Sequence, residues 1–213
     1  MKKKLSLNGF EEKRIHCIPT FTASKTTIGK QQIGSYGLYF GRVTEEKGVE
    51  TVIKAYEKLP EYTVKIMGDD TTDEAKRLKK YVENHKMKNV EFLGFKSGAE
   101  LENVIKGARF TLIPSIWYDN LPNTALESFQ YSKPVIASNI GSLPELVIDG
   151  ENGYLFKPSN VEDLIKKIKM LDDDTLVKKM GQASRKRLES RFAPQTHYED
   201  LMKIFNEAVK SRK

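Results

Sequence analysis

Two carboxylate residues, Asp119 and Glu127, stand eight positions apart on either side of an expected helix start at Pro122, Asn123 and Thr124. We expect Asp119 to lie in a loop at the end of a strand and Glu127 to lie about one turn into the following helix. The N-terminus of a helix offers unpaired backbone N–H groups and a positive dipole end to a diphosphate. Carboxylates on both sides of it could accept hydrogen bonds from sugar and ribose hydroxyls. The segment therefore indicates a site for a sugar nucleotide.

The elements around this segment alternate between short apolar strands and amphipathic helices. Strands are expected at residues 36–40, 62–67, 90–93, 108–113, 134–138 and 153–156. Helices are expected at 49–59, 73–85, 99–106, 123–131 and 161–171, with a short helical turn at 141–145. Repeated strand–helix–strand units predict an α/β fold, a Rossmann-like doubly wound parallel sheet.

Ligands of such sheets bind outside the carboxyl ends of the strands, at a topological switch point. The loops at 41–48, 68–70, 94–95 and 114–121 each follow a strand and precede a helix. Residues far apart in the sequence are therefore expected to converge at one edge of the sheet.

The two ends of the chain differ from its middle. Residues 14–19 read as one strand, followed by a Thr-, Ser-, Lys- and Gly-rich stretch up to Gly34 that resembles a loop or linker. From about residue 174 the chain is helical, with a break near 193–194. A helix over 195–209 places Tyr198, Leu201, Met202 and Phe205 on one side, and this side needs an apolar surface to cover.

Length and composition limit the functional classes. A chain of 213 residues with 38% hydrophobic residues can form one main domain. A single cysteine, Cys17, excludes an internal disulfide, and no apolar run is long enough for a membrane span, so we expect a cytoplasmic protein. The basic start has no apolar core behind it and is not a secretory signal.

The net charge of +7 favours an anionic partner, which could be nucleic acid, an acidic membrane surface or a phosphorylated ligand. The lysines do not decide among these, because lysines spread through helices usually form solvated faces. The sequence has no arginine-aromatic signature of nucleic-acid binding, so we expect no nucleic-acid partner.

The strand-end loops, in this order, resemble the carboxyl-terminal, donor-binding half of family 4 retaining glycosyltransferases, the glycosyl transferases group 1, which have the GT-B fold. The resemblance covers residues 36–192. Residues 41–48 look like the family's G-R-x-x-x-E-K-G loop, and 119–127 look like its E-x7-E element. Residues 133–138, 141–145 and 149–156 follow at the family's usual intervals.

The resemblance implies roles for particular residues. Arg42 and Lys47 would clamp the donor diphosphate, and fixed cations there would stabilise the departing nucleotide diphosphate without proton transfer. Asp119 completes the implied catalytic set, and Glu127 would accept hydrogen bonds from the ribose. The implied donor-binding set also contains Gly41, Gly94, Phe95, Asn120, Leu121, Asn123 and Thr124, with Gly94 and Phe95 near the base. UDP or GDP is the expected nucleotide.

The sequence departs from the family pattern at two positions. Asp119 is one methylene shorter than the usual glutamate, which shortens its reach toward a donor sugar. Pro122 removes one backbone donor, so N–H contacts to phosphate would come from Asn123 and Thr124. Each of three aromatic residues has two possible roles. Phe95 could stack on the base or belong to the core. Trp117 and Tyr118 could line the sugar pocket or pack against neighbouring residues.

No metal and no cofactor are expected, the nucleotide sugar being a substrate. The histidines His16, His85 and His197 are isolated, and the acidic run at 172–174 reads as a solvated helix cap. The resembled family likewise needs no bound divalent ion, because its two basic side chains act in its place.

The resemblance also implies a missing part. GT-B enzymes bind the acceptor largely on an amino-terminal domain that this chain lacks. Residues 1–34 then read as the end of that domain plus the interdomain linker, 35–192 as the nucleotide-sugar domain, and 193–213 as a terminal helix that crosses back. The implied partners are a nucleotide sugar, the missing domain and an inner membrane face that the intact enzyme could contact peripherally.

The implied activity of the intact protein is transfer of a hexosyl group to a glycan or lipid-linked acceptor, with retention, in polysaccharide or cell-surface glycan synthesis. The isolated half would be inactive. Two other classes stay open, a non-catalytic nucleotide-binding module and a module that binds anionic surfaces. A nucleotide-sugar epimerase of the same fold would need a catalytic base between paired domains, and the sequence offers no candidate.

Overall fold

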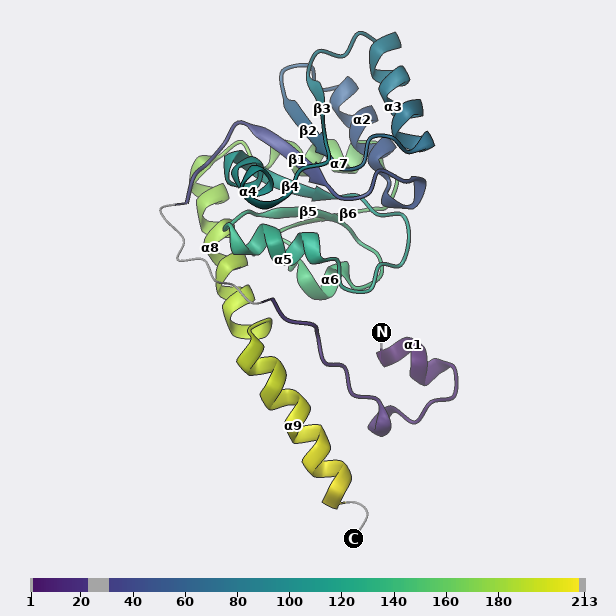
Figure 1. Cartoon of the computed structure of the whole chain (residues 1–213), viewed down its shortest axis with the longest axis vertical. Coiled ribbons are helices and arrows are strands. Elements are labelled where there is room, and N and C mark those ends of the chain that lie inside the picture. The colour runs from purple at the N-terminus through teal and green to yellow at the C-terminus, as the bar shows by residue number, and fades with distance from the viewer. Residues whose placement is uncertain (1, 23–30, 211–213) are drawn as a thin grey trace.

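The computed structural model describes residues 2–22 and 31–210, which form a six-stranded sheet with helices on both faces and helical segments at each end (Figure 1). The strands are β1 (Tyr36–Phe40), β2 (Thr63–Met67), β3 (Val90–Gly94), β4 (Ala108–Ile113), β5 (Val135–Ser138) and β6 (Gly153–Phe156). Every neighbouring pair is parallel, in the order β3-β2-β1-β4-β5-β6. The predicted doubly wound parallel sheet is confirmed, and its switch point lies between β1 and β4, where the strand order reverses.

Helices cover both faces of this sheet (Figure 1). One face carries α2 (Val49–Glu57), α3 (Asp73–Asn84) and α7 (Val161–Lys169). The other carries α4 (Gly98–Gly107), α5 (Asn123–Gln130) and α6 (Leu143–Leu146). The helix α8 (Asp174–Arg191) packs along α5, and α9 (Pro194–Lys210) continues beyond it, away from the sheet.

Alternate residues of each strand point to opposite faces, and both faces are buried in the central strands β1, β4 and β5. On the face of α2, Tyr39 of β1 and Leu112 of β4 are paired neighbours in the same core cluster. On the other face, Leu38 packs with α4 and Ile113 packs with α5. Burial on both sides explains why these central strands are mostly apolar, whereas β2 and β3 each carry a charged residue, Lys65 and Glu91. Each predicted strand end lies within one residue of the observed one.

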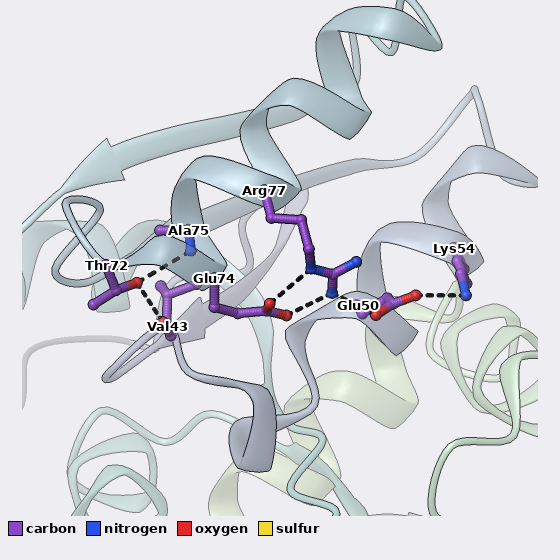
Figure 2. Close-up of polar contacts among 7 residues, drawn as sticks. All are labelled: Val43, Glu50, Lys54, Thr72, Glu74, Ala75 and Arg77. Atoms are coloured by element: carbon purple, nitrogen blue, oxygen red, sulfur yellow. Dashed lines mark hydrogen bonds and ion pairs between the residues drawn. The ribbon is translucent and has the colours of Figure 1, made fainter.

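The loop after β1 is tethered to α3 (Figure 2). The hydroxyl of Thr72 accepts a hydrogen bond from the backbone of Ala75 at 3.1 Å, which caps the helix, and donates to the carbonyl of Val43 at 2.6 Å. Arg77, one turn further along α3, bonds Glu50 of α2 at 2.6 Å. Both ends of the loop are thereby held against the helices on this face of the sheet.

One sequence-based expectation about the amino-terminal segment is wrong. The chain begins with α1 (Lys2–Leu7), which was not expected, and a 3-10 turn η1 (Glu12–Arg14). The strand predicted over 14–19 is not formed, because no strand lies beside it to share its backbone hydrogen bonds. Instead the carbonyl of Pro19 bonds the ring of His197 in α9, at 2.8 Å. Residues 23–30 of the expected linker lie outside the described residues.

The predicted carboxyl-terminal helix is confirmed as α9, which extends away from the sheet domain (Figure 1). None of its residues is buried, and its aromatic residues Tyr198 and Phe205 are each more than half exposed. The apolar side of this helix therefore covers no core in the part of the chain that the structure describes.

Candidate functional site

A cavity of about 200 Å³ lies at the carboxyl ends of β1 and β4, at the switch point of the sheet. Three segments line this first cavity: the end of β1 with its loop, the end of β4 with its loop, and the start of α5. Six predicted site residues are brought together here: Gly41, Arg42, Lys47, Asp119, Asn123 and Thr124. Four of its other lining residues, Tyr39, Phe40, Leu112 and Ile113, are apolar or aromatic strand ends that the sequence placed in strands but not in the site.

Lys47 and Asp119 form an ion pair in this cavity. The ammonium of Lys47 lies 2.7 and 2.8 Å from the two carboxylate oxygens of Asp119, and the two side chains are 20% and 17% exposed. The hydroxyl of Ser115, a buried residue that the sequence did not single out, donates to the same carboxylate at 2.6 Å. Asp119 is therefore engaged with its protein neighbours on both oxygens.

Gly48 permits the contact between the two loops that carry this pair. Its φ is +68°, and an added Cβ would lie 2.1 Å from the carbonyl oxygen of Pro114. Next to this contact, the backbone N–H of Ile116 donates to the carbonyl of Glu46 at 3.0 Å, within the 3-10 turn η2 (Glu45–Lys47). A side chain at position 48 would push the loops apart, so glycine is required for Lys47 to reach Asp119.

Arg42 lies at the rim of the first cavity with its side chain largely exposed. Its one described ion pair, to Glu46, is long at 3.9 Å. Its carbonyl accepts a hydrogen bond from the Tyr39 hydroxyl, whose pKa is raised by burial first and by the charge of Asp119 second. The backbone of Arg42 is thus held in place while its guanidinium remains available to an anion.

The start of α5 completes the cavity. No side chain of the described residues caps it, whereas Thr72, Asn160 and Asp173 cap the starts of α3, α7 and α8. The first N–H groups of an uncapped helix lack intrahelical partners, so those of Asn123 and Thr124 are suited to bind an anion. Arg42 adds a positive charge to these N–H groups, whereas the charge of Lys47 is balanced by Asp119.

Glu127 does not line the first cavity but stands one turn beyond it. It is four residues after Asn123 and three after Thr124, which places it on the same side of α5. Burial raises the pKa of its carboxyl, and no described residue supplies it with a hydrogen bond or an ion pair. The carboxylate is therefore half-buried and has no hydrogen-bond donor among the described residues.

Besides Glu127, four predicted site residues lie outside the first cavity. Gly94 and Phe95 stand at the end of β3, separated from β1 by β2. Phe95 is 74% exposed, so the core interpretation of this residue is wrong. Asn120 and Leu121 belong to the loop before α5, but they line a second, larger cavity.

Trp117 and Tyr118 are 64% and 60% exposed, on the loop between Ser115 and Asp119. The packing interpretation of these aromatic residues is therefore wrong. They do not line the first cavity either.

Lys133 has a structural role that its sequence position did not reveal. It is 1% exposed, and its ammonium donates to the carbonyls of Gln32, Lys106 and Ala108 at 2.7, 2.6 and 2.7 Å. Burial lowers the pKa of Lys133 to about 8. The residue ties the chain before β1 to the beginning of β4, at the edge of the sheet opposite the cavity. The position of a lysine directly before a buried strand was the sequence feature that could have indicated this structural role.

Within residues 2–22 and 31–210, no group of three His, Cys, Asp or Glu side chains is arranged to hold a metal ion. The same residues contain no helix with the length and apolar character needed to cross a membrane.

Comparison with known proteins adds to this geometry. The family model described as glycosyl transferases group 1 matches residues 24–187. The chain is 30% identical over 174 residues to an uncharacterised glycosyltransferase of Methanocaldococcus jannaschii, in a match that covers 81% of this chain and 48% of that protein. The chain thus spans about half the length of the curated relatives it matches.

Solved structures share the fold. A glycosyltransferase from Rickettsia africae superposes with a TM-score of 0.85 at 21% identity, over 98% of this chain and 62% of that one. The Anabaena protein HepE, solved in complex with UDP, superposes with a TM-score of 0.74 at 23% identity, over 82% of this chain and 49% of that one. The Anabaena protein has also been solved with UDP-glucose.

Proposed function

Because the chain belongs to the glycosyl transferases group 1 family, we propose that it is the donor-binding half of a retaining glycosyltransferase. The intact enzyme would move a hexosyl group from a nucleotide sugar to a glycan or lipid-linked acceptor, in polysaccharide or cell-surface glycan synthesis. The observation that carries this proposal is the convergence of Arg42, Lys47 and the uncapped start of α5 on one cavity at the switch point.

In this proposal the donor diphosphate lies between the start of α5 and the two cations. Cleavage of the bond between sugar and phosphate leaves negative charge on the diphosphate, and cations and N–H groups already in place stabilise that charge. Two hydrogens of the Lys47 ammonium are directed to Asp119, which leaves a third donor for the phosphate.

Asp119 acts through Lys47 in this proposal. With both oxygens engaged by Lys47 and Ser115, its carboxylate fixes the ammonium rather than a sugar hydroxyl. Glu127, which lacks a donor, accepts hydrogen bonds from the ribose hydroxyls. The reaction needs no metal ion, because Arg42, Lys47 and the helix start provide the positive charge.

UDP is the nucleotide best supported, since the Anabaena protein of the same fold was solved with UDP and with UDP-glucose. GDP is the alternative. Gly94 and Phe95 would contact the base from the end of β3, and the exposed ring of Phe95 is available for stacking. We expect the intact enzyme to work in the cytoplasm, either free or at the inner membrane face.

A second domain would complete the enzyme. The chain spans 48% of its Methanocaldococcus relative, and the apolar side of α9 covers no described core. Residues 1–34 would connect to that domain, 35–192 would bind the donor, and 193–213 would return to the domain and cover its surface. The chain alone would therefore bind a nucleotide without transferring a sugar.

Titration of this chain with UDP, GDP and ADP, followed by protein NMR, tests the proposal. Arg42→Ala and Glu127→Ala should each weaken binding of the preferred nucleotide about tenfold or more, since each removes hydrogen bonds to a charged group. The matched controls Lys80→Ala and Glu83→Ala, which remove exposed charges on α3, should leave the affinity unchanged.

Other outcomes would favour other functions. Binding that depends on Arg42 but not on Glu127 would indicate a nucleotide module of a more general kind. Binding to anionic vesicles that salt abolishes, with no nucleotide binding, would indicate a module for anionic surfaces. The absence of binding to any nucleotide would contradict the proposed donor site.

A further inference from the structure

A second cavity, of about 770 Å³, lies on the other side of the loop that carries Asp119. The loop separates the two cavities: Asp119 and Pro122 line the first, whereas Asn120 and Leu121 line the second. Residues 15–20 form one wall of the second cavity, and α6 with the carboxyl end of α8 forms the opposite wall. A ligand in this cavity would be one loop away from the proposed donor.

Arg187 of α8 lines this second cavity and is not neutralised. One of its terminal nitrogens donates to the carbonyl of Glu145 at 2.5 Å, but its Nε is buried and has no hydrogen-bond partner among the described residues. Burial lowers the pKa of Arg187, and the nearby charge of Arg191 lowers it further, against the opposing charge of Glu151. The guanidinium is half-buried and forms no ion pair with a described residue, so an anion in the cavity would complement its charge.

The second arginine of the cavity wall is already engaged. Arg191 forms an ion pair with Asp200 of α9 at 3.0 Å. Glu145 also lines the cavity, yet its carboxylate is not among the charges that act on Arg187. Among the described arginines that line the cavity, Arg187 is therefore the one whose charge has no ion-pair partner.

The remaining walls are largely apolar. Leu121, Leu146 and Phe192 face Leu5, Ile15 and Ile18 across the cavity. Phe192 and Leu146 are buried and belong to the core cluster around α5 and α6, so this side of the cavity is firmly built. A ligand that matches the whole cavity combines one anionic group with an apolar chain.

We propose that the second cavity binds the phosphate of an amphiphilic acceptor, with the phosphate on the guanidinium of Arg187 and the apolar chain along Ile15, Ile18 and Leu121. The description of this ligand as the acceptor rests on the proposed function. The anion site does not, since it follows from a guanidinium that forms no ion pair with a described residue and from the apolar walls around it. A phosphate held there would place a group attached to it beside the loop of Asp119, and hence beside the donor.

The test is a titration of the whole chain with octyl phosphate, followed through the backbone N–H signals of the cavity and the Nε–H signal of Arg187. We expect the Nε–H signal to shift on binding. Octyl glucoside, which has the same chain and no charge, and inorganic phosphate, which has the charge and no chain, should each bind at least about tenfold more weakly.

Three variants locate the site. Arg187→Gln should weaken octyl phosphate about tenfold or more, and Arg187→Lys, which keeps the charge, should restore part of the affinity. Lys186→Gln removes an exposed charge from the same turn of α8, outside the cavity lining, and should leave the affinity unchanged. None of the three should alter UDP binding. Titrating UDP and octyl phosphate into the same variants therefore distinguishes the two sites.

Several results would overturn the inference. Equal binding of octyl glucoside would mean a merely apolar cavity, and unchanged binding by Arg187→Gln would remove the anion site. Loss of octyl phosphate binding in Arg42→Ala alone would assign the phosphate to the first cavity. A failure of UDP to bind would contradict the proposed function, while a positive octyl phosphate result would still establish the anion site.

Discussion

The ammonium of Lys47 contacts both carboxylate oxygens of Asp119, at 2.7 and 2.8 Å, although 72 positions separate the two residues in the sequence. The pair joins the loop after β1 to the loop after β4, the two strands between which the sheet order reverses. It thereby places a cation and its counter-ion at the centre of the proposed donor site.

Asp119→Asn should lower the free energy of unfolding by about 1–3 kcal/mol, because it leaves a mostly buried ammonium without its partner. Urea unfolding measures this change. The control Asp73→Asn breaks a fully exposed pair with Lys76 and should change stability by less than about 0.5 kcal/mol.

The same Asp119→Asn variant distinguishes two roles of the carboxylate. If Asp119 acts through Lys47, UDP and UDP-glucose should lose affinity by the same factor in calorimetric titrations. A loss confined to UDP-glucose would mean that the carboxylate contacts the sugar, as the family's glutamate is expected to do.

Gly48→Ala should separate the two loops that meet at the first cavity. An added Cβ would lie 2.1 Å from the carbonyl of Pro114, at a φ of +68°. We expect a loss of at least about 2 kcal/mol in unfolding free energy, together with weaker UDP binding. Gly150→Ala is the matched control, since Gly150 has a φ of +80° and no atom near the added Cβ. Its loss should be about 1 kcal/mol, with UDP binding unchanged.

Glu127→Gln should stabilise the fold at neutral pH while it weakens nucleotide binding. Burial raises the pKa of the Glu127 carboxyl, so between the unfolded and folded pKa values the folded chain binds more protons than the unfolded chain. This residue therefore makes stability fall as the pH rises through that window, and the glutamine variant lacks the fall.

Urea unfolding at pH 4 and pH 7 checks this prediction, and the advantage of Glu127→Gln should be larger at pH 7. UDP affinity should fall about tenfold or more. Glu83→Gln, on the exposed side of α3, should change neither quantity. A variant that is less stable at pH 7 than the parent would show that Glu127 has a donor in the folded chain.

Lys133→Met should destabilise the fold by about 2–4 kcal/mol at pH 7, because three backbone carbonyls lose their donor. The loss should also depend on pH. The pKa of Lys133 is about 8 in the folded chain and that of an exposed lysine is about 10.4, so the unfolded chain binds more protons between these values. Stability from this residue therefore rises with pH in that window.

Relative to Lys133→Met, the parent chain should gain about 2 kcal/mol in unfolding free energy between pH 7 and pH 9.5. Chemical unfolding at the two pH values measures the difference. Lys80→Met, which replaces an exposed lysine, should show no such dependence. A constant difference would mean that the three carbonyls keep the ammonium protonated throughout this range.

The sequence was informative about strands and uninformative about isolated aromatic residues, for one physical reason. A strand such as β4 is buried on both faces, so five of its six residues are buried and this burial becomes visible as a pattern. Phe95 and Trp117 stand alone in loops, where a general tendency toward burial is a weak guide, and both are largely exposed. The strand predicted over 14–19 failed because a strand also needs a neighbour, which the sequence of one segment cannot show.

The sequence by itself determined the alternation of strands and helices, and with it the parallel sheet, the loops at its carboxyl edge and the helix start at Asn123. These features follow from local periodicity and turn residues. The tertiary structure alone decided that Lys47 pairs with Asp119, that Lys133 is buried under three carbonyls, and that a second cavity lies beside Arg187. Such contacts depend on strand order, loop packing and side-chain burial, which are set when distant segments meet and leave no periodic trace in the chain.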